Sequence, residues 1–264
     1  MTRRTHAISL TVIATLLAAT GCDHSEKQYD FLQRAQSQYY DLLSAGVKEY
    51  HCDVHLDWDA LLTSLKEKPQ DDSPWLQYLR QSHLTFSAPL QTWVGGPTVE
   101  WVDPFPPPAG KQDQAKFAQD TSRSLVMTFL TVWKSSLNGT EFPSLPSPDI
   151  KITPKSDGYT LTLHSTQDSI TEWTMDKSMR ITHTSIHGPK VSGEMDEKYM
   201  QSPKGLLLIE FDYLTPNPAA LHVIRTMRTA YANVGDAQVP ASLSIDMYDG
   251  AQVRMQFSHC GVMD

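Results

Sequence analysis

Hydrophobic and polar residues alternate with two different periods in the first part of the chain. Between residues 29 and 43 the apolar residues recur at helical spacing, which predicts an amphipathic helix that ends at Gly46. The period becomes two between residues 50 and 58, which predicts a half-buried strand with one apolar and one polar face. Two short helices are expected next, near residues 58–67 and 73–83.

The strongest helical pattern lies between two proline-rich segments, residues 103–110 and 142–148. Residues 112–137 predict a long amphipathic helix, which Asn138 and Gly139 end. The prolines on either side predict rigid connectors rather than further helix. The expected apolar face of this helix carries Phe117, Leu125, Phe129, Leu130 and Trp133.

After Asp149 the chain becomes a series of short alternating strands separated by turns. Asp157-Gly158 and Asp249-Gly250 are typical of tight hairpins, because both residue types tolerate the left-handed backbone of such turns. Successive hairpins predict a curved antiparallel meander and the α+β class rather than a parallel α/β sheet. Strands are expected at residues 150–153, 159–164, 171–175, 179–186, 206–213, 222–232, 243–247 and 253–260.

The first 22 residues have the pattern of an export signal. Arg3 and Arg4 precede an apolar run from residue 8 to 19, which is shorter than the ~20 residues of a membrane-spanning helix. Small residues then lead to Cys22. This junction resembles the lipobox of bacterial lipoproteins, with Ala19 where that motif usually has leucine. The resemblance implies cleavage before Cys22, which would carry diacylglycerol and usually a third acyl chain.

This interpretation divides the chain into a signal peptide at residues 1–21, a lipidated tether at residues 22–28 and a single α+β domain at residues 29–264. The domain is expected in the cell envelope, outside the cytoplasm, held at a bacterial membrane by its N-terminal acyl chains. The alternative is an ordinary secreted protein in which Cys22 follows the apolar run by chance. The sequence leaves the choice between inner and outer membrane open.

The charge of the chain narrows the classes of partner. Asp and Glu number 30 against 22 Lys and Arg, so the formal net charge is −8 at pH 7. An acidic surface opposes binding to nucleic acid and to anionic lipid headgroups. We therefore expect no nucleic-acid partner, and we expect contact with the membrane through the acyl chains alone.

Three cysteines are present, and lipidation of Cys22 would leave Cys52 and Cys260 as a pair in an oxidising compartment. A disulfide between them would join the first expected strand to the last. Strict alternation, however, places Cys52 on an apolar strand face and Cys260 on a polar one, whereas two bridged residues should share a face. A bulge near His259, or an end of the strand there, would remove this conflict.

The usual catalytic signatures are missing from the sequence, which has no G-x-S-x-G, H-E-x-x-H, C-x-x-C or glycine-rich phosphate loop. We therefore expect neither catalysis nor a cofactor. The one weak metal candidate is the group His51, Asp53 and His55, which alternation places on one strand face at intervals of about 6.5–7 Å. The competing interpretation is a solvated polar face without a metal.

Two short motifs in the strand-rich half bear on the family. Trp173-Thr-Met-Asp176 ends one strand and begins a turn, and Val239-Pro240-Ala241-Ser242-Leu243 leads into a later strand. Together with a long N-terminal helix and helices that interrupt the sheet, this order resembles the periplasmic lipoprotein carriers LolA and LolB and their relative RseB. The resemblance implies an incomplete antiparallel barrel that is partly wrapped on amphipathic helices and encloses an apolar cavity for acyl chains.

The expected function is non-catalytic binding of a lipid, acyl chain or other apolar ligand in a sheet-lined cavity. An envelope scaffold protein with a filled core is the first alternative, and an envelope hydrolase or metal-binding protein is the second. Ligand identity, protein partners and oligomeric state are not specified by the sequence. The expected cavity lining is Leu161, Leu163, Trp173, Ile209, Phe211, Leu243 and Ile245.

Overall fold

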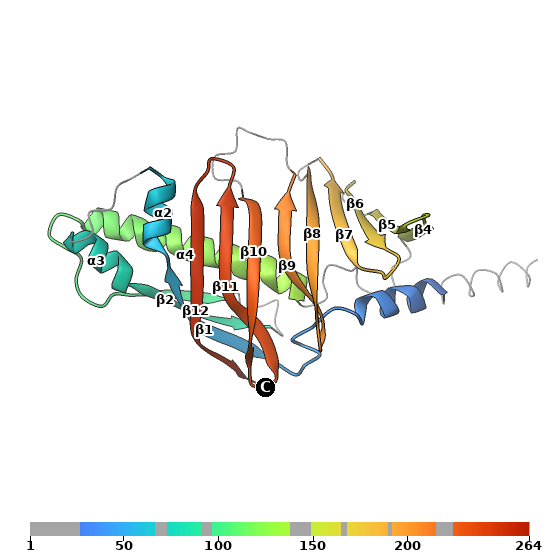
Figure 1. Ribbon diagram of the computed structural model, residues 1–264, viewed down its shortest axis with the longest axis horizontal. Coiled ribbons are helices and arrows are strands. Elements are labelled where there is room, and N and C mark those ends of the chain that lie inside the picture. The colour runs from blue at the N-terminus through green and yellow to red at the C-terminus, as the bar shows by residue number, and fades with distance from the viewer. Residues whose placement is uncertain are drawn as a thin grey trace, which may run out of the picture.

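The computed structural model of this protein is built on one curved antiparallel sheet (Figure 1). The structure describes residues 27–66, 73–90, 97–137, 149–164, 168–189, 192–214 and 224–263 of the chain. Within these residues the sheet has twelve strands. Their bounds are β1 Glu49–Leu56, β2 His83–Pro89, β3 Thr98–Val102, β4 Ile150–Pro154, β5 Gly158–His164, β6 Ile170–Asp176, β7 Ile181–His187, β8 Ser192–Ser202, β9 Gly205–Tyr213, β10 Ile224–Val234, β11 Ala237–Met247 and β12 Gln252–Met263.

The strand order joins the two ends of the chain within the sheet. Strands β4 to β12 follow one another as an antiparallel meander, and β12 then pairs with β1, beside which β2 and β3 complete the sheet. The antiparallel meander expected from the turn signals is therefore confirmed. The sheet is open, with β3 and β4 as its two edges. Helices accompany it, so the molecule belongs to the α+β class but is dominated by its strands.

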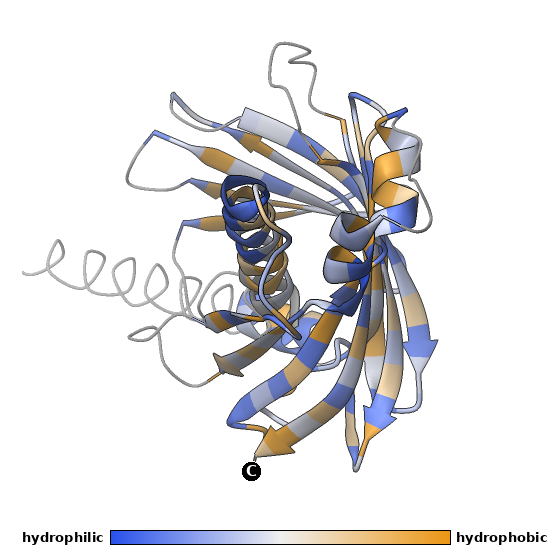
Figure 2. Cartoon of the chain, turned by 90° about the vertical axis from the view of Figure 1, so that its left-hand side faces the viewer, coloured by the Kyte–Doolittle hydropathy of each residue, from blue (hydrophilic) through white to orange (hydrophobic). Residues whose placement is uncertain are grey.

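The long helix α4 (Gln112–Leu137) connects the two edge strands and lies in the hollow of the curled sheet (Figure 2). A helix of 26 residues is about 39 Å long, whereas twelve strands laid flat would span about 50 Å. Curling of the sheet brings its edges within reach of one helix. The Phe129 ring lies 5.4 Å from that of Phe257, and the Trp133 ring lies 5.1 Å from that of Tyr50, so α4 packs on the concave face.

The buried side of α4 is narrower than the sequence predicted. Phe117, expected on the apolar face, is 73% exposed, so that prediction was wrong. Successive helical residues are turned by about 100°, and Phe117 therefore points about 200° away from Ala115, which is buried. The buried side consists of Ala115, Ala118, Ser122, Val126, Phe129, Leu130 and Trp133.

Hydrogen bonds fix the short helices and the segment that precedes α4. Helix α2 (Trp58–Ser64) is capped by Asp57, whose carboxylate accepts a 2.9 Å bond from the backbone N–H of Ala60. The Ser73 hydroxyl caps α3 (Pro74–Gln81) in the same way. Asp103 then accepts hydrogen bonds from the Tyr78 hydroxyl at 2.5 Å and from the Trp101 indole at 2.6 Å.

None of the helices in the described ranges is long and apolar enough to cross a bilayer.

The N-terminal helix ends earlier than the apolar spacing predicted, because its helical residues in the described part of the chain are 27–36. The chain then leaves the helix and bonds to β9: Tyr39 and Leu206 form a parallel bridge, and the Tyr40 N–H donates to the Leu206 carbonyl at 3.0 Å. Gly205 permits this close approach, since a Cβ there would lie 2.8 Å from the Tyr40 backbone nitrogen. Tertiary hydrogen bonds thus end the helix early.

Candidate functional site

The concave face of the sheet is a continuous wall of side chains that can be followed from strand to strand. Directly opposed residues of an antiparallel pair share a face. Leu161 of β5 opposes Trp173 of β6, and Phe211 of β9 opposes Met227 of β10, which in turn opposes Ile245 of β11. The pairs in between, and those that reach β1 through β12, keep the same face: Trp173–Thr184, Thr184–Met195, Met195–Tyr213, Leu243–Met255 and Leu56–Met255.

Six of the seven residues expected to line a cavity lie on this concave wall. Five of the six are buried, and the sixth, Leu163, is half-buried. The five are Leu161, Trp173, Phe211, Leu243 and Ile245. Ile209, the seventh expected residue, lies at a bulge of β9, between two residues that pair with consecutive residues of β8. The structure thus brings the expected lining to one face, and the presence of a ligand cavity there stays a prediction.

A polar cluster interrupts the apolar wall and was not expected from the sequence. Glu197 of β8 is buried and accepts hydrogen bonds from the Thr184 hydroxyl at 2.6 Å and from the Tyr199 hydroxyl at 2.5 Å. Burial, and after it the Glu197 charge, raises the pKa of the Tyr213 hydroxyl above its ordinary value. The signal in the sequence was the alternation of Met195, Glu197 and Tyr199, which places an acidic residue on the apolar side of a strand.

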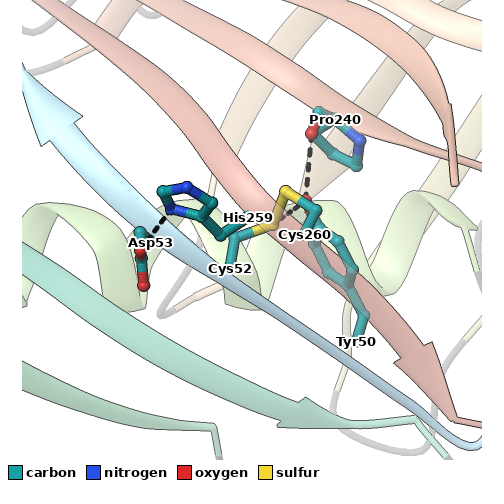
Figure 3. The surroundings of a disulfide bond; sticks show 6 residues. All are labelled: Tyr50, Cys52, Asp53, Pro240, His259 and Cys260. Atoms are coloured by element: carbon teal, nitrogen blue, oxygen red, sulfur yellow. Dashed lines mark hydrogen bonds and ion pairs between the residues drawn. A yellow bond between two sulfur atoms is a disulfide. The ribbon is translucent and has the colours of Figure 1, made fainter.

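A disulfide joins Cys52 of β1 to Cys260 of β12, with their Cα atoms 4.1 Å apart (Figure 3). The conflict between the two strand faces is removed by a bulge: His51 opposes Gly261 and Asp53 opposes Ser258, so two residues of β12 face Cys52 alone. His259 in this bulge has a φ of 49°. The left-handed residue shifts the alternation by one position and turns Cys260 toward the same side as Cys52.

The disulfide lies beside a buried tyrosine between the sheet and α4. The Tyr50 hydroxyl lies 2.8 Å from the Cys52 sulfur and donates a 2.9 Å hydrogen bond to the Pro240 carbonyl of β11 (Figure 3). Burial raises the pKa of the Tyr50 hydroxyl far above its ordinary value, so this group stays neutral and donating. Tyr50 therefore ties β1 to β11 across β12, next to the covalent link.

In the structure, the three side chains of the weak metal candidate on β1 have separate partners. His51 lies over Gly261, where an added Cβ would come within 2.4 Å of its Nε2 atom. Asp53 contacts His259, whose Nδ1 atom is 2.8 Å from a carboxylate oxygen. His55 stacks instead on His83 of β2, with ring centroids 5.2 Å apart. In the part of the chain that the structure describes, no three His, Cys, Asp or Glu side chains meet in a ready metal-binding geometry.

A shallow cleft of about 580 Å³ lies away from the concave wall. It runs between the end of the N-terminal helix, the following segment to Ala45 and the turn that carries Lys204. Glutamine, serine and tyrosine side chains make up most of its lining, together with Asp41 and Lys204, so it has many more polar groups than the concave wall. No protein-family model, curated protein or solved structure matches the chain.

Proposed function

We propose that this protein is a lipid-anchored, non-catalytic protein of the cell envelope that binds an acyl chain or a similar apolar ligand against the concave face of its sheet. The observation that carries the proposal is the apolar wall that runs in register from β5 to β1 around α4. An apolar ligand gains about 25 cal/mol for each Å² of surface that such a wall removes from water. The N-terminal export pattern and Cys22, which lie outside the described residues, support the envelope location.

The packing of α4 against the concave face also supports ligand binding. Two polar atoms on its buried side, the Ser122 hydroxyl oxygen and the Trp133 indole nitrogen, have no hydrogen-bond partner among the residues that the structure describes. Each such group costs about 1–3 kcal/mol when it is buried without a partner. The helix is therefore held in the hollow less firmly than an all-apolar helix of the same area, and a ligand with a polar group could satisfy these atoms.

One observation favours the scaffold alternative. Leu161, Phe211 and Ile245 are at most 2% exposed, so the central wall is covered in this structure. A protein that carried no ligand would need no more than this filled core, and its acidic outer surface would then meet protein partners. The two functions differ in whether an apolar probe enters the domain, which the following experiment measures.

The half-buried Leu163 offers a test of ligand binding that spares the most tightly packed positions. We expect a fluorescent fatty-acid probe to bind the mature chain without its acyl chains, and Leu163→Asp to weaken that binding about tenfold or more. An unpaired carboxylate on the wall must be desolvated when the probe binds beside it, and a tenfold loss corresponds to about 1.4 kcal/mol. Probe fluorescence titration measures both affinities.

Thr174→Asp is the matched control, because Thr174 lies on a neighbouring strand with its side chain exposed on the opposite face. It adds the same charge and should leave probe binding unchanged. Thermal unfolding of both variants shows whether the domain stays folded. Absence of probe binding to the unaltered domain, or equal binding by both variants, would remove the support for ligand carriage and favour the scaffold alternative.

Lipidation of Cys22 is tested separately from ligand binding. In a bacterial host we expect the mature chain to begin at Cys22, with the mass of the N-terminal peptide raised by diacylglycerol and a further acyl chain. Two or more buried chains anchor a protein stably, since each buried CH₂ contributes about 0.8 kcal/mol. The protein should therefore sediment with membranes, and Cys22→Ser should abolish the modification. An unmodified Cys22, or cleavage elsewhere, contradicts the lipoprotein assignment.

A further inference from the structure

A second candidate site lies outside the concave wall, in the cleft of about 580 Å³ beside the N-terminal helix. Its volume falls within the range of about 300–1,000 Å³ that small-molecule sites occupy. The lining comes from residues 33–45 and from Lys204, in the turn between β8 and β9. In Figure 1 the blue segment that follows the N-terminal helix reaches the lower ends of these two strands. We name this site the polar cleft.

Backbone hydrogen bonds hold both sides of the polar cleft in place. The Tyr40 N–H donates to the Leu206 carbonyl at 3.0 Å, and the Leu206 N–H donates to the Gln38 carbonyl at 2.8 Å. In the turn on the other side, the Ser202 hydroxyl accepts a 3.1 Å bond from the Lys204 N–H. The cleft therefore has a fixed shape, and a ligand that enters it loses less free energy to ordering the protein.

Two buried tyrosines form part of the lining and fix it to the sheet. Tyr39 is 9% exposed, and its hydroxyl accepts a 2.7 Å bond from the Ile181 N–H of β7. Tyr40 is 3% exposed, and its hydroxyl accepts a 2.8 Å bond from the Gln238 N–H of β11. The segment that lines the cleft is thus tied to β7 and β11 as well as to β9.

The two charged groups of the polar cleft already have partners within the protein. Asp41 accepts a 2.9 Å bond from the Leu43 N–H and a 2.6 Å bond from the Ser44 hydroxyl. The Lys204 ammonium donates to the Asp236 backbone carbonyl and lies 4.0 Å from the carboxylate of the same residue. The cleft therefore holds one charge of each sign, and both are engaged locally. This arrangement favours neither an anionic nor a cationic ligand.

The remaining polar groups of the lining are neutral side chains at the end of the N-terminal helix. Gln33, Gln36 and Ser37 are spaced by three and four residues, which brings them together on one face. Leu32 and Ala35, which lie between these positions in the sequence or next to them, are buried. A side-chain amide carries donors and an acceptor, and a hydroxyl is both at once. This face therefore suits ligand groups that donate and accept together.

We propose that the polar cleft binds a neutral saccharide, whose hydroxyl groups form hydrogen bonds with the side-chain amides of Gln33 and Gln36. A saccharide carries many hydroxyls and no charge, so it suits a lining of amides and hydroxyls whose two charges are already engaged. An acyl chain in the cleft would instead cover polar groups without bonding to them, at a cost for each group. The proposal does not depend on whether the concave wall binds an apolar ligand.

Calorimetric titration of the full chain with maltose and with N,N′-diacetylchitobiose tests the site, in a detergent that has no sugar headgroup. We expect saturable binding of at least one disaccharide, with the same affinity at low and high salt because no ion pair forms. Loss of one hydrogen bond in Gln33→Ala should weaken this binding about fivefold. In the unaltered protein, the bound disaccharide should shift the side-chain amide resonances of Gln33 and Gln36.

Gln114→Ala is the matched control, because Gln114 is an exposed glutamine of α4 outside the lining of the polar cleft. It should leave disaccharide affinity unchanged. Alanine is favourable in a helix, so Gln33→Ala and Gln114→Ala should both unfold at the temperature of the unaltered protein. Absence of saturable binding by both disaccharides, unchanged affinity in Gln33→Ala, or an equal loss in Gln114→Ala would overturn the proposal.

Purified peptidoglycan distinguishes two sources of the same saccharide chemistry. If the ligand is a glycan strand of the cell envelope, the protein should sediment with this polymer and be released by an excess of the disaccharide that binds the cleft. If the disaccharide binds and the protein stays in solution, the ligand is a free oligosaccharide. Both results agree with a saccharide site, and they differ only in where the saccharide comes from.

Discussion

Removal of the Cys52–Cys260 disulfide is expected to lower the free energy of unfolding by about 5 kcal/mol. The two cysteines are 208 residues apart, so the bond restricts almost the whole unfolded chain, and the chain-entropy account gives its largest effects for such long loops. The bond also crosses the β1–β12 junction, which is where the first three strands join the meander. Urea denaturation of the mature chain, oxidised and reduced, measures the difference.

The double variant Cys52→Ala with Cys260→Ala is the comparison of choice, because a single replacement leaves a free thiol. We expect Tyr50 to keep its hydrogen bond to Pro240 in that variant while it loses its 2.8 Å contact with the Cys52 sulfur, so the loss reports mainly on the covalent link. An oxidised protein and a double variant with the same unfolding midpoint would contradict this prediction.

Phe129→Ala is expected to destabilise the domain by about 3–5 kcal/mol. The side chain is 1% exposed and packs between Trp133 of the same helix and Phe257 of β12. Its removal deletes apolar contact and leaves a cavity between α4 and the sheet, which accounts for the large effects of such truncations. Thermal or urea unfolding of the purified domain gives the value.

Phe117→Ala supplies the control on the same helix. It removes the same atoms from a side chain that faces solvent, so its effect should lie within about 0.5 kcal/mol of zero. Similar losses for the two variants would mean that α4 is not seated in the hollow as described. If Phe129→Ala also increases binding of a fatty-acid probe, α4 and the ligand compete for the same wall.

The elements predicted best from the sequence were those whose local pattern and tertiary environment agree. Helix α4 was predicted with the bounds that the structure describes, Gln112–Leu137, since the flanking prolines and Asn138-Gly139 restrict it locally; Asn138 and Gly139 themselves lie outside the described residues. Strand β8 was missed because its residues are mostly polar, and apart from Tyr199 its buried positions are Glu197 and Ser202. The N-terminal helix was predicted too long, because its end is set by Leu206, a residue far along the chain.

The candidate sites were predictable only as far as they follow from alternation within one strand. Alternation within β1 placed His51, Asp53 and His55 on one face of that strand. Alternation within β5 likewise placed Leu161 and Leu163 on one face of theirs. Nothing local indicates that β12 pairs with β1, or that His83 lies beside His55. Those neighbours depend on long-range strand order, and a positive φ at one histidine was needed to bring the two cysteines together.

The position of β1 beside β12 has a consequence for the order in which the molecule can assemble. Once Val102 has been made, β1, β2 and β3 must wait for the last strand before they can join the sheet. During that time a three-stranded fragment presents the edge of β1, with Cys52 on its apolar face, to any other chain nearby. The folding protein therefore passes through a stage in which β1 can pair with the wrong chain. Removal of β12 from the C-terminus would leave β1, β2 and β3 permanently in that unpaired state.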